Sequence, residues 1–155
     1  MTDDTFAERI VAMTPTLYRV CYSELREASD REDAVQEALT RAWQKRASLR
    51  DERFMQTWLV RILINECRNI QRRRPAQTLD ELPAPPPGAD VGLHDSLLSL
   101  PDKLRLPMVL HYIEGYKVEE IAKMLGVPQG TVKSRLYAAR REMREKLSEE
   151  AEYTW

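Results

Sequence analysis

Residues 118–141 read VEEIAKMLGVPQGTVKSRLYAARR, and this stretch predicts two short helices joined by a tight turn. Its first half repeats apolar residues at i, i+3, i+4 and i+7, the spacing of one buried helix face: Val118, Ile121, Ala122 and Leu125. Gly126 follows, where helices commonly end in the left-handed conformation, and Pro128 suits the first turn of a new helix. The pattern therefore predicts a helix-turn-helix.

The second helix of this motif separates an apolar side from a basic side. The apolar side comprises Val132, Leu136, Ala139 and Met143. The other side, with no acidic residue from 129 to 141, comprises Thr131, Lys133, Ser134, Arg135, Tyr137, Arg140 and Arg141. A basic helix alone usually marks only a hydrated surface. Behind a short helix and a glycine turn, it is predicted to be a recognition helix that enters a DNA groove.

Composition limits the class of protein. A length of 155 residues allows one domain or two small ones, and 43% hydrophobic residues suffice for compact cores. The formal net charge is −1, so DNA binding requires local segregation of basic residues. No apolar run approaches the roughly 18 residues of a membrane span, and the acidic N-terminus MTDDTFAER is unlike a signal peptide. We expect a soluble chain that stays in the cytoplasm.

Neither the cysteines nor the histidines indicate a metal centre or an active site. Cys21 and Cys67 lie at helical core spacing without a CxxC pattern, which argues against a zinc site or a disulfide framework. His94 and His111 are 17 residues apart with no carboxylate or cysteine at ligand spacing. No phosphate loop or nucleophile motif is present. We expect no cofactor and no metal, and an enzyme is the least favoured class.

Charge and proline content divide the chain into three parts. Residues 1–74 carry 14 Lys or Arg and 12 Asp or Glu, and residues 103–155 carry ten bases and eight acids. Between them, residues 75–102 carry five acids and no base, and their prolines cannot continue a helix. Strand-like alternation is absent, which predicts an all-α protein. Its expected parts are a helical domain over 1–74, a linker over 75–92 and a helical domain over 93–155.

Three or four helices are expected in the first domain. The buried stripe of the first helix comprises Ile10, Met13, Leu17, Val20 and Cys21. Ser29 and Glu32 have the spacing of a capping box that opens the second helix, whose stripe comprises Val35, Ala38, Leu39, Ala42 and Trp43. The last helix starts near Met55 and buries Leu59, Ile62, Leu63, Cys67 and Ile70.

The opposite side of this last helix combines bases with amides. Arg61, Asn65, Arg68 and Arg72 follow at i, i+4, i+7 and i+11, with Asn69 beside them. Arginines supply phosphate contacts and amides supply hydrogen bonds to base edges, so the arc favours nucleic acid. The simpler interpretation is a basic helix end that interacts favourably with the helix dipole.

Three motifs together resemble the extracytoplasmic-function sigma factors of bacterial RNA polymerase. They occur in the order of that family: DAVQEALTRAWQK (33–45), FMQTWLVRILINECRNIQRRR (54–74) and GYKVEEIAKMLGVPQGTVKSRLYAARREMREKL (115–147). The resemblance covers roughly 10–148 and includes the acidic, proline-rich spacer. It implies two domains: region 2, which binds core polymerase and the −10 promoter element, and region 4, which binds the −35 element.

Individual roles follow from this resemblance. The helix over 33–45 is similar to the contact with the clamp helices of the polymerase β′ subunit, which implies a role for Asp33, Gln36, Glu37, Arg41 and Trp43. The following motif resembles the part that opens the −10 element, which implies DNA contacts by Trp58, Arg61, Asn65, Arg68, Asn69 and Arg72. Glu66 and Cys67 depart from the small residues expected there. The −35 contacts implied in region 4 are Thr131, Lys133, Ser134, Arg135, Tyr137, Arg140 and Arg141.

The resemblance also implies partners: the β′ and β subunits of core polymerase, promoter DNA and an anti-sigma factor, with no direct membrane contact. We expect a monomer when free, whose tethered domains sample many separations and bind promoter DNA poorly alone. Two other classes stay open. A one-component helix-turn-helix regulator leaves the motifs of 33–74 unexplained, and no heptad run for dimerisation is evident. A sigma-like decoy that sequesters an anti-sigma factor does not need the basic surfaces.

Overall fold

The computed structural model describes residues 1–73 and 91–153, with side chains placed for 1–73 and 95–146. Every regular element in these residues is helical, which confirms the all-α prediction. The α-helices are α1 (Asp3–Ala12), α2 (Thr14–Glu24), α3 (Ala28–Gln44), α4 (Met55–Arg73), α5 (Val91–Leu98), α6 (Asp102–Met108), α7 (Val118–Leu125) and α8 (Gln129–Tyr153). None of these described helices is both long enough and apolar enough to cross a bilayer.

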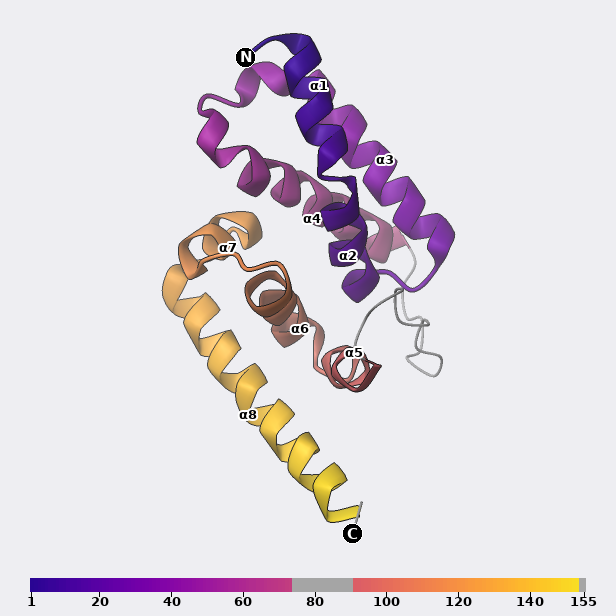
Figure 1. Cartoon of the computed structure of the whole chain (residues 1–155), viewed down its shortest axis with the longest axis vertical. Helices are drawn as coiled ribbons and strands as arrows, with labels where there is room; N and C mark the ends of the chain where they lie inside the picture. Colours follow the sequence, from indigo (N-terminus) through magenta and orange to yellow (C-terminus); the bar gives the residue numbers. More distant parts are fainter. Residues whose placement is uncertain (74–90, 154–155) are drawn as a thin grey trace.

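Helices α1–α4 form the first domain, in which α3 packs along α4 (Figure 1). The predicted first helix is two helices, because Pro15 has no N–H with which to continue the α-helical ladder from α1. Met13 ends α1 and also precedes the first residue of α2. The apolar stripe nevertheless stays intact across the break, since Ile10, Leu17 and Val20 are all buried.

The start of α3 differs from the predicted capping box. The helix begins at Ala28, so Ser29 already lies inside its first turn, and the preceding Glu27 makes no side-chain capping bond. The turn between α2 and α3 is instead closed by Arg31, which donates to the carbonyl oxygens of Leu25 at 3.0 Å and Arg26 at 2.7 Å. A buried guanidinium thus satisfies backbone acceptors that a serine cap would have left alone.

Helices α5–α8 form the second domain, and the predicted helix-turn-helix is confirmed. Gly126 ends α7 with φ +68°, in the left-handed region, and Pro128 directly precedes α8. The predicted inner side of α8 is buried throughout: Val132, Leu136, Ala139 and Met143. Upstream, Pro107 lies inside α6, and the helix then widens into a π-helical segment, η3 (Val109–Ile113), in which the Glu114 N–H donates to the Val109 oxygen at 3.0 Å.

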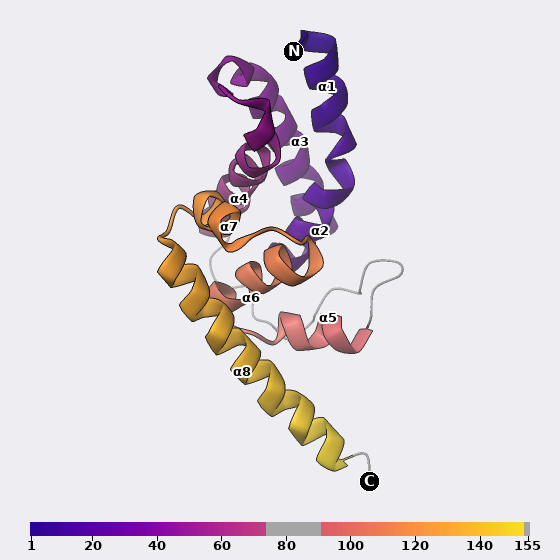
Figure 2. The ribbon, with the colours of Figure 1, turned by 60° about the vertical axis from the view of Figure 1, so that its left-hand side comes forward.

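The two domains pack against each other (Figures 1 and 2). Helix α7 lies along α4, and α6 contacts α2. The expectation that the domains sample many separations does not describe this structure, because buried apolar side chains of both domains form one continuous cluster. Most of the predicted linker, up to residue 90, lies outside the described residues. Its last two positions belong to α5, which begins at Val91.

Candidate nucleic-acid and protein interfaces

The predicted recognition helix presents most of its basic side to solvent. The exposed members of the set are Lys133, Ser134, Tyr137, Arg140 and Arg141, whereas Thr131 and Arg135 are half-buried. Arg140 donates to the Tyr112 hydroxyl at 2.8 Å, a contact that orients its guanidinium. The Thr131 N–H already donates to the Pro128 oxygen at 3.0 Å, so it is not the free phosphate donor expected from its place at the helix start.

The predicted −10 surface of α4 is divided between two neighbours. Arg61 lies near the second domain, where its Nη2 is 3.8 Å from the position a Cβ would take on Gly126. Arg68 is half-buried at the same boundary and lines a cavity together with Arg135 of α8. Asn69 faces the opposite way, toward α3. The predicted −10 residues of α4 therefore do not form one surface: some lie toward α7 and α8, and others lie toward α3.

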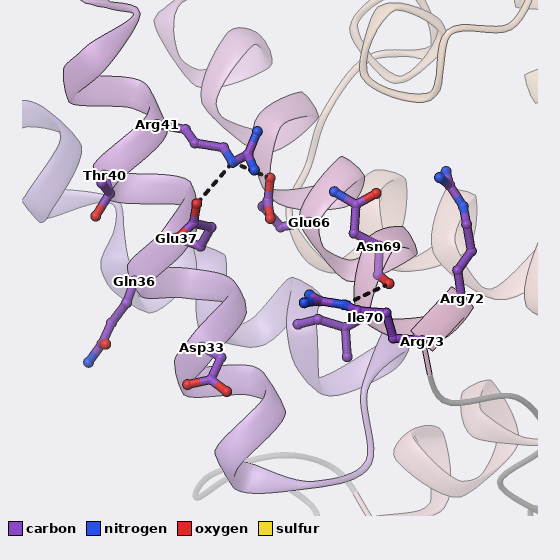
Figure 3. A pocket seen from close by; sticks show the side chains of 10 residues that line it. All are labelled: Asp33, Gln36, Glu37, Thr40, Arg41, Glu66, Asn69, Ile70, Arg72 and Arg73. Atoms are coloured by element: carbon purple, nitrogen blue, oxygen red, sulfur yellow. Dashed lines mark hydrogen bonds and ion pairs between the residues drawn. The ribbon is translucent and has the colours of Figure 1, made fainter.

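Between α3 and α4 lies an open groove of about 790 Å³ (Figure 3). Its lining comprises Asp33, Gln36, Glu37, Thr40, Arg41, Glu66, Asn69, Ile70, Arg72 and Arg73. Four of the five predicted polymerase contacts are in this set, together with two of the predicted −10 contacts. The α3 wall is mainly acidic and amide, whereas the α4 wall ends in arginines, so the groove carries opposite charges on its two walls.

An ion pair fixes the middle of this groove. Arg41 Nε lies 2.7 Å from Glu66 Oε1 and 3.1 Å from Glu37 Oε1 (Figure 3). The Glu66 side chain is 6% exposed, whereas that of Arg41 is 41% exposed. Glu66 therefore departs from the expected small residue for a reason within the domain: it points toward α3 and holds Arg41 in the groove.

The two predicted tryptophans lie against the core. Trp43 is 37% exposed and contacts Phe6, with ring centroids 6.2 Å apart, while the Arg46 guanidinium lies 4.1 Å above its ring. Trp58 is half-buried and meets the same Phe6 ring edge-on at 5.9 Å. Their packing with Phe6 shows that both tryptophans help to hold α1 on the domain, besides any contact that they make outside it.

Besides Ile70, which it placed in the buried stripe, sequence reasoning missed three residues of the groove lining as candidate contacts: Thr40, Glu66 and Arg73. Thr40 could have been found, because Asp33, Gln36, Glu37 and Thr40 follow at i, i+3, i+4 and i+7. The only sequence indication of a role for Glu66 was its charge within an otherwise apolar stretch. Its partner, 25 residues earlier on another helix, could not be read from local spacing.

Comparisons with known proteins agree with this two-domain architecture. Residues 10–76 match the family described as Sigma-70 region 2, and residues 91–143 match Sigma-70, region 4. The ECF RNA polymerase sigma factor SigW of Bacillus subtilis is 32% identical over 93% of this chain and 89% of its own. The chain belongs to the ECF sigma factors. The ECF RNA polymerase sigma-E factor of Escherichia coli is also 32% identical, over 73% of this chain and 71% of its own.

Two solved structures extend the likeness to the packing of the domains. The sigma factor RpoE of Bartonella quintana, in complex with the anti-sigma factor NepR, matches with a TM-score of 0.79 and 26% identity, over 93% of this chain and 97% of its own. CnrH, in complex with the cytosolic domain of CnrY, matches with a TM-score of 0.74 and 25% identity, over 95% and 90%. Such scores over both domains require a similar relative placement, so this sigma factor has the domain arrangement of those two complexes.

Membership of this family gives the chain its general function. It is a transcription initiation factor that directs RNA polymerase to promoters and helps to open the −10 element. Sigma factors are non-catalytic components of initiation.

Proposed function

We propose that this sigma factor binds core polymerase through the α3 wall of the groove, contacts the −10 element with α4 and recognises the −35 element with α8. It acts in the cytoplasm, without enzymatic activity of its own and without a cofactor. The observation that carries the proposal is the segregation of charge in a chain of net charge −1: exposed acids on α3 and exposed bases on α4 and α8.

The polymerase contact is assigned to the outer side of α3. Asp33, Gln36 and Glu37 are exposed and lie on the groove wall, so they are available to a partner. Arg41 stands one turn further along and is held by Glu66. Trp43, with its exposed edge, completes the set. A wall with fixed charges needs little reordering on binding, which favours a stable contact.

The −10 contact is assigned to α4. Its exposed Arg61, Asn65 and Arg72 are available for phosphate and base contacts, with the half-buried Arg68, Asn69 and Trp58 beside them. Opening a base pair costs a few kcal/mol, which is offset when the freed base stacks on an aromatic ring or hydrogen-bonds to an amide.

The −35 contact is assigned to α8. Lys133, Arg135 and Tyr137 lie in its first turns, the part of a recognition helix that contacts base edges, and Thr131 and Ser134 belong to the same turns. Arg140 and Arg141 lie further along and are suited to the flanking phosphates.

An anti-sigma factor is proposed as a further partner. This rests on the domain arrangement shared with RpoE, which is in complex with the anti-sigma factor NepR, and with CnrH, which is in complex with the cytosolic domain of CnrY. Such a partner would bind the arrangement in which both domains are already together.

A binding experiment tests the polymerase surface. Glu37→Lys is expected to weaken the affinity for core polymerase at least tenfold, with the far-ultraviolet circular dichroism unchanged because Glu37 is exposed. The matched control is Glu8→Lys, the same reversal at an exposed position of α1. Equal affinities of the Glu37→Lys, Glu8→Lys and wild-type chains for polymerase would contradict the assignment of the α3 wall.

A further inference from the structure

The interface between the domains contains a buried carboxyl group that lacks a full set of partners. Glu24 ends α2, and its Oε1 lies 4.0 Å from Nε of Arg105 on α6, too far for a hydrogen bond. The Glu24 and Arg105 side chains are only 10% and 5% exposed. Neither of these two atoms has a hydrogen-bond partner among the described residues. Burying a charge with incomplete compensation is costly.

The other Glu24 contacts come from its own domain. Gln71 of α4 donates from Nε2 to the Glu24 backbone oxygen at 2.9 Å and to Oε2 at 3.4 Å. A cavity of about 230 Å³ adjoins the carboxyl group between the domains. The other ionisable side chains that line it are Cys67 and Arg68 of α4, Asp102 and Lys103 of α6, and Arg135 of α8.

These surroundings favour the neutral form of Glu24. Burial raises its pKa from an ordinary 4.5 to about 7, although Arg105, Gln71 and Arg68 oppose the shift, and Asp102 adds to it. Arg105 cannot neutralise the carboxylate well because it is engaged elsewhere. It donates to the short contact with Asp102 and, at 3.4 Å each, to the backbone oxygens of Leu98 and Leu100.

Two further polar contacts link the domains away from this junction. Arg19 of α2 binds Glu114 of the second domain through two hydrogen bonds, 2.6 Å from Nε and 3.1 Å from Nη2. Nζ of Lys123 in α7 lies 4.6 Å from the centre of the Phe54 ring. These three polar contacts add to the apolar packing between the domains, and among them only the Glu24 contact buries a carboxyl group without complete hydrogen bonding.

Closure also restricts the two proposed DNA surfaces. Arg68 of α4 and Arg135 of α8 line the same cavity, so each occupies space beside the other. A recognition helix in the major groove has a phosphate backbone on each flank. With α4 on the Arg135 flank, a duplex cannot approach α8 there. The closed state therefore covers part of each proposed DNA surface, at Arg68 and at Arg135, although most other residues of the two surfaces stay exposed.

We infer that the chain closes on itself without a partner, that this closed state masks the parts of the two proposed DNA surfaces around Arg68 and Arg135, and that the protonation of Glu24 controls how readily it opens. The masking rests on the proposed DNA surfaces, whereas closure and its control by Glu24 do not. Opening exposes Glu24 to water and returns its pKa to the ordinary range. The closed state consequently binds a proton more tightly than the open state.

The sign of the effect follows from that difference. Proton binding stabilises closure fully below pH 4.5, and the stabilisation is lost as the pH rises through about 7. Between these values one proton is released on opening, so the ratio of open to closed chains increases about tenfold for each pH unit. A small change of pH just below neutrality is therefore expected to change the ratio of open to closed chains.

Distance measurements between spin labels test this inference on the full chain without DNA or polymerase. Labels attached at Gln44→Cys and Gln129→Cys, both exposed positions in different domains, report the domain separation. The native Cys21 and Cys67 are buried and react slowly. We expect one short distance at pH 5.5 and a growing population of longer distances by pH 8.5. Glu24→Gln is expected to keep the short distance at both pH values.

Two more variants make the result decisive. Glu8→Gln removes the same charge at an exposed position and is expected to open like the wild type. Asp102→Asn, at a side chain that is 79% exposed, is expected to open less than the wild type at pH 8.5, because it removes a negative charge that raises the Glu24 pKa and frees Arg105 to pair with the ionised carboxylate. A wild-type distance that does not change with pH, or a Glu24→Gln chain that opens like the wild type, would overturn the inference. Either outcome would leave the proposed DNA and polymerase contacts untouched.

Discussion

Two buried glutamates of this chain have opposite surroundings. Glu66 lies within one domain and is 2.7 Å from Arg41, whose side chain also reaches solvent. Glu24 lies between two domains and is 4.0 Å from Arg105, whose Nε makes no hydrogen bond with any described residue. Burial shifts the pKa of Glu24 upward to about 7. The first pair thus joins two helices within one domain, whereas the second lies where the two domains meet.

The largest effect is expected from breaking the first pair. Arg41→Ala leaves the Glu66 carboxylate buried without its cation, which should lower the free energy of unfolding by about 3 kcal/mol. The value lies at the low end of that range because Arg41 is partly exposed, so water screens the pair. Urea unfolding of the variant and the wild type measures the difference. An unchanged midpoint would show that the pair does not stabilise the domain.

In the second pair, replacing the glutamate is expected to raise the free energy of unfolding. Because the Glu24 pKa is raised in the closed chain, its contribution to stability is lost as the pH rises from about 4.5 to 7. Glu24→Gln should therefore become more stable than the wild type by roughly 2 kcal/mol at pH 8 and equal to it near pH 5. Thermal unfolding at several pH values measures this. If the stabilities of the wild type and Glu24→Gln changed with pH in the same way, Glu24 would not be the group whose ionisation destabilises the chain.

A smaller effect separates the contacts along α8. Arg135→Ala is expected to cost about 1–3 kcal/mol in binding to a matched −35 site but little on a scrambled one, if its guanidinium contacts base edges. Arg140→Ala, further along the helix, should weaken both sites equally and reduce the salt dependence of binding. Fluorescence anisotropy with the polymerase complex at two salt concentrations compares them. Identical losses for the two variants on both sites would contradict the groove assignment.

The smallest effect is expected at the outer contact between the domains. Arg19 is 46% exposed and Glu114 only 5%, much as in the Arg41–Glu66 pair, but the amide of Arg19→Gln still offers this carboxylate a donor, so the loss to closure should be only about 1 kcal/mol. Arg19→Gln should increase the open population slightly at every pH and leave the midpoint set by Glu24 unchanged. The spin-label distances measure both. A shift in that midpoint would mean that Arg19 and Glu24 are not independent.

The difference between local patterns and contacts of distant segments explains how much of the fold could be predicted from the sequence. The helix-turn-helix was predicted with its buried side and its glycine turn, because helical spacing and turn chemistry are local properties. Most of the α3 wall was implied by the family resemblance of the motif over 33–45. The split between α1 and α2 had a local signal in Pro15 that the continuous apolar stripe concealed. The misplaced capping box followed from a helix start two residues earlier than its pattern suggests.

Contacts between distant segments could not be predicted in this way. Arg41 and Glu66 lie on different helices, and Glu24 and Arg105 lie in different domains. Nothing in the spacing of these residues indicates that they meet. The acidic, proline-rich stretch suggested separated domains, whereas the packing of α4 on α7 depends on surfaces that form only after both domains fold.

Run-off transcription tests the central claim most directly. The purified chain is added to bacterial core polymerase on a promoter library, beside an Arg135→Ala chain as a matched control that keeps the fold of region 2. The account predicts initiation from a defined set of promoters sharing −10 and −35 elements, with selection at the −35 position lost in the variant. Binding to polymerase without specific initiation from any promoter would contradict it.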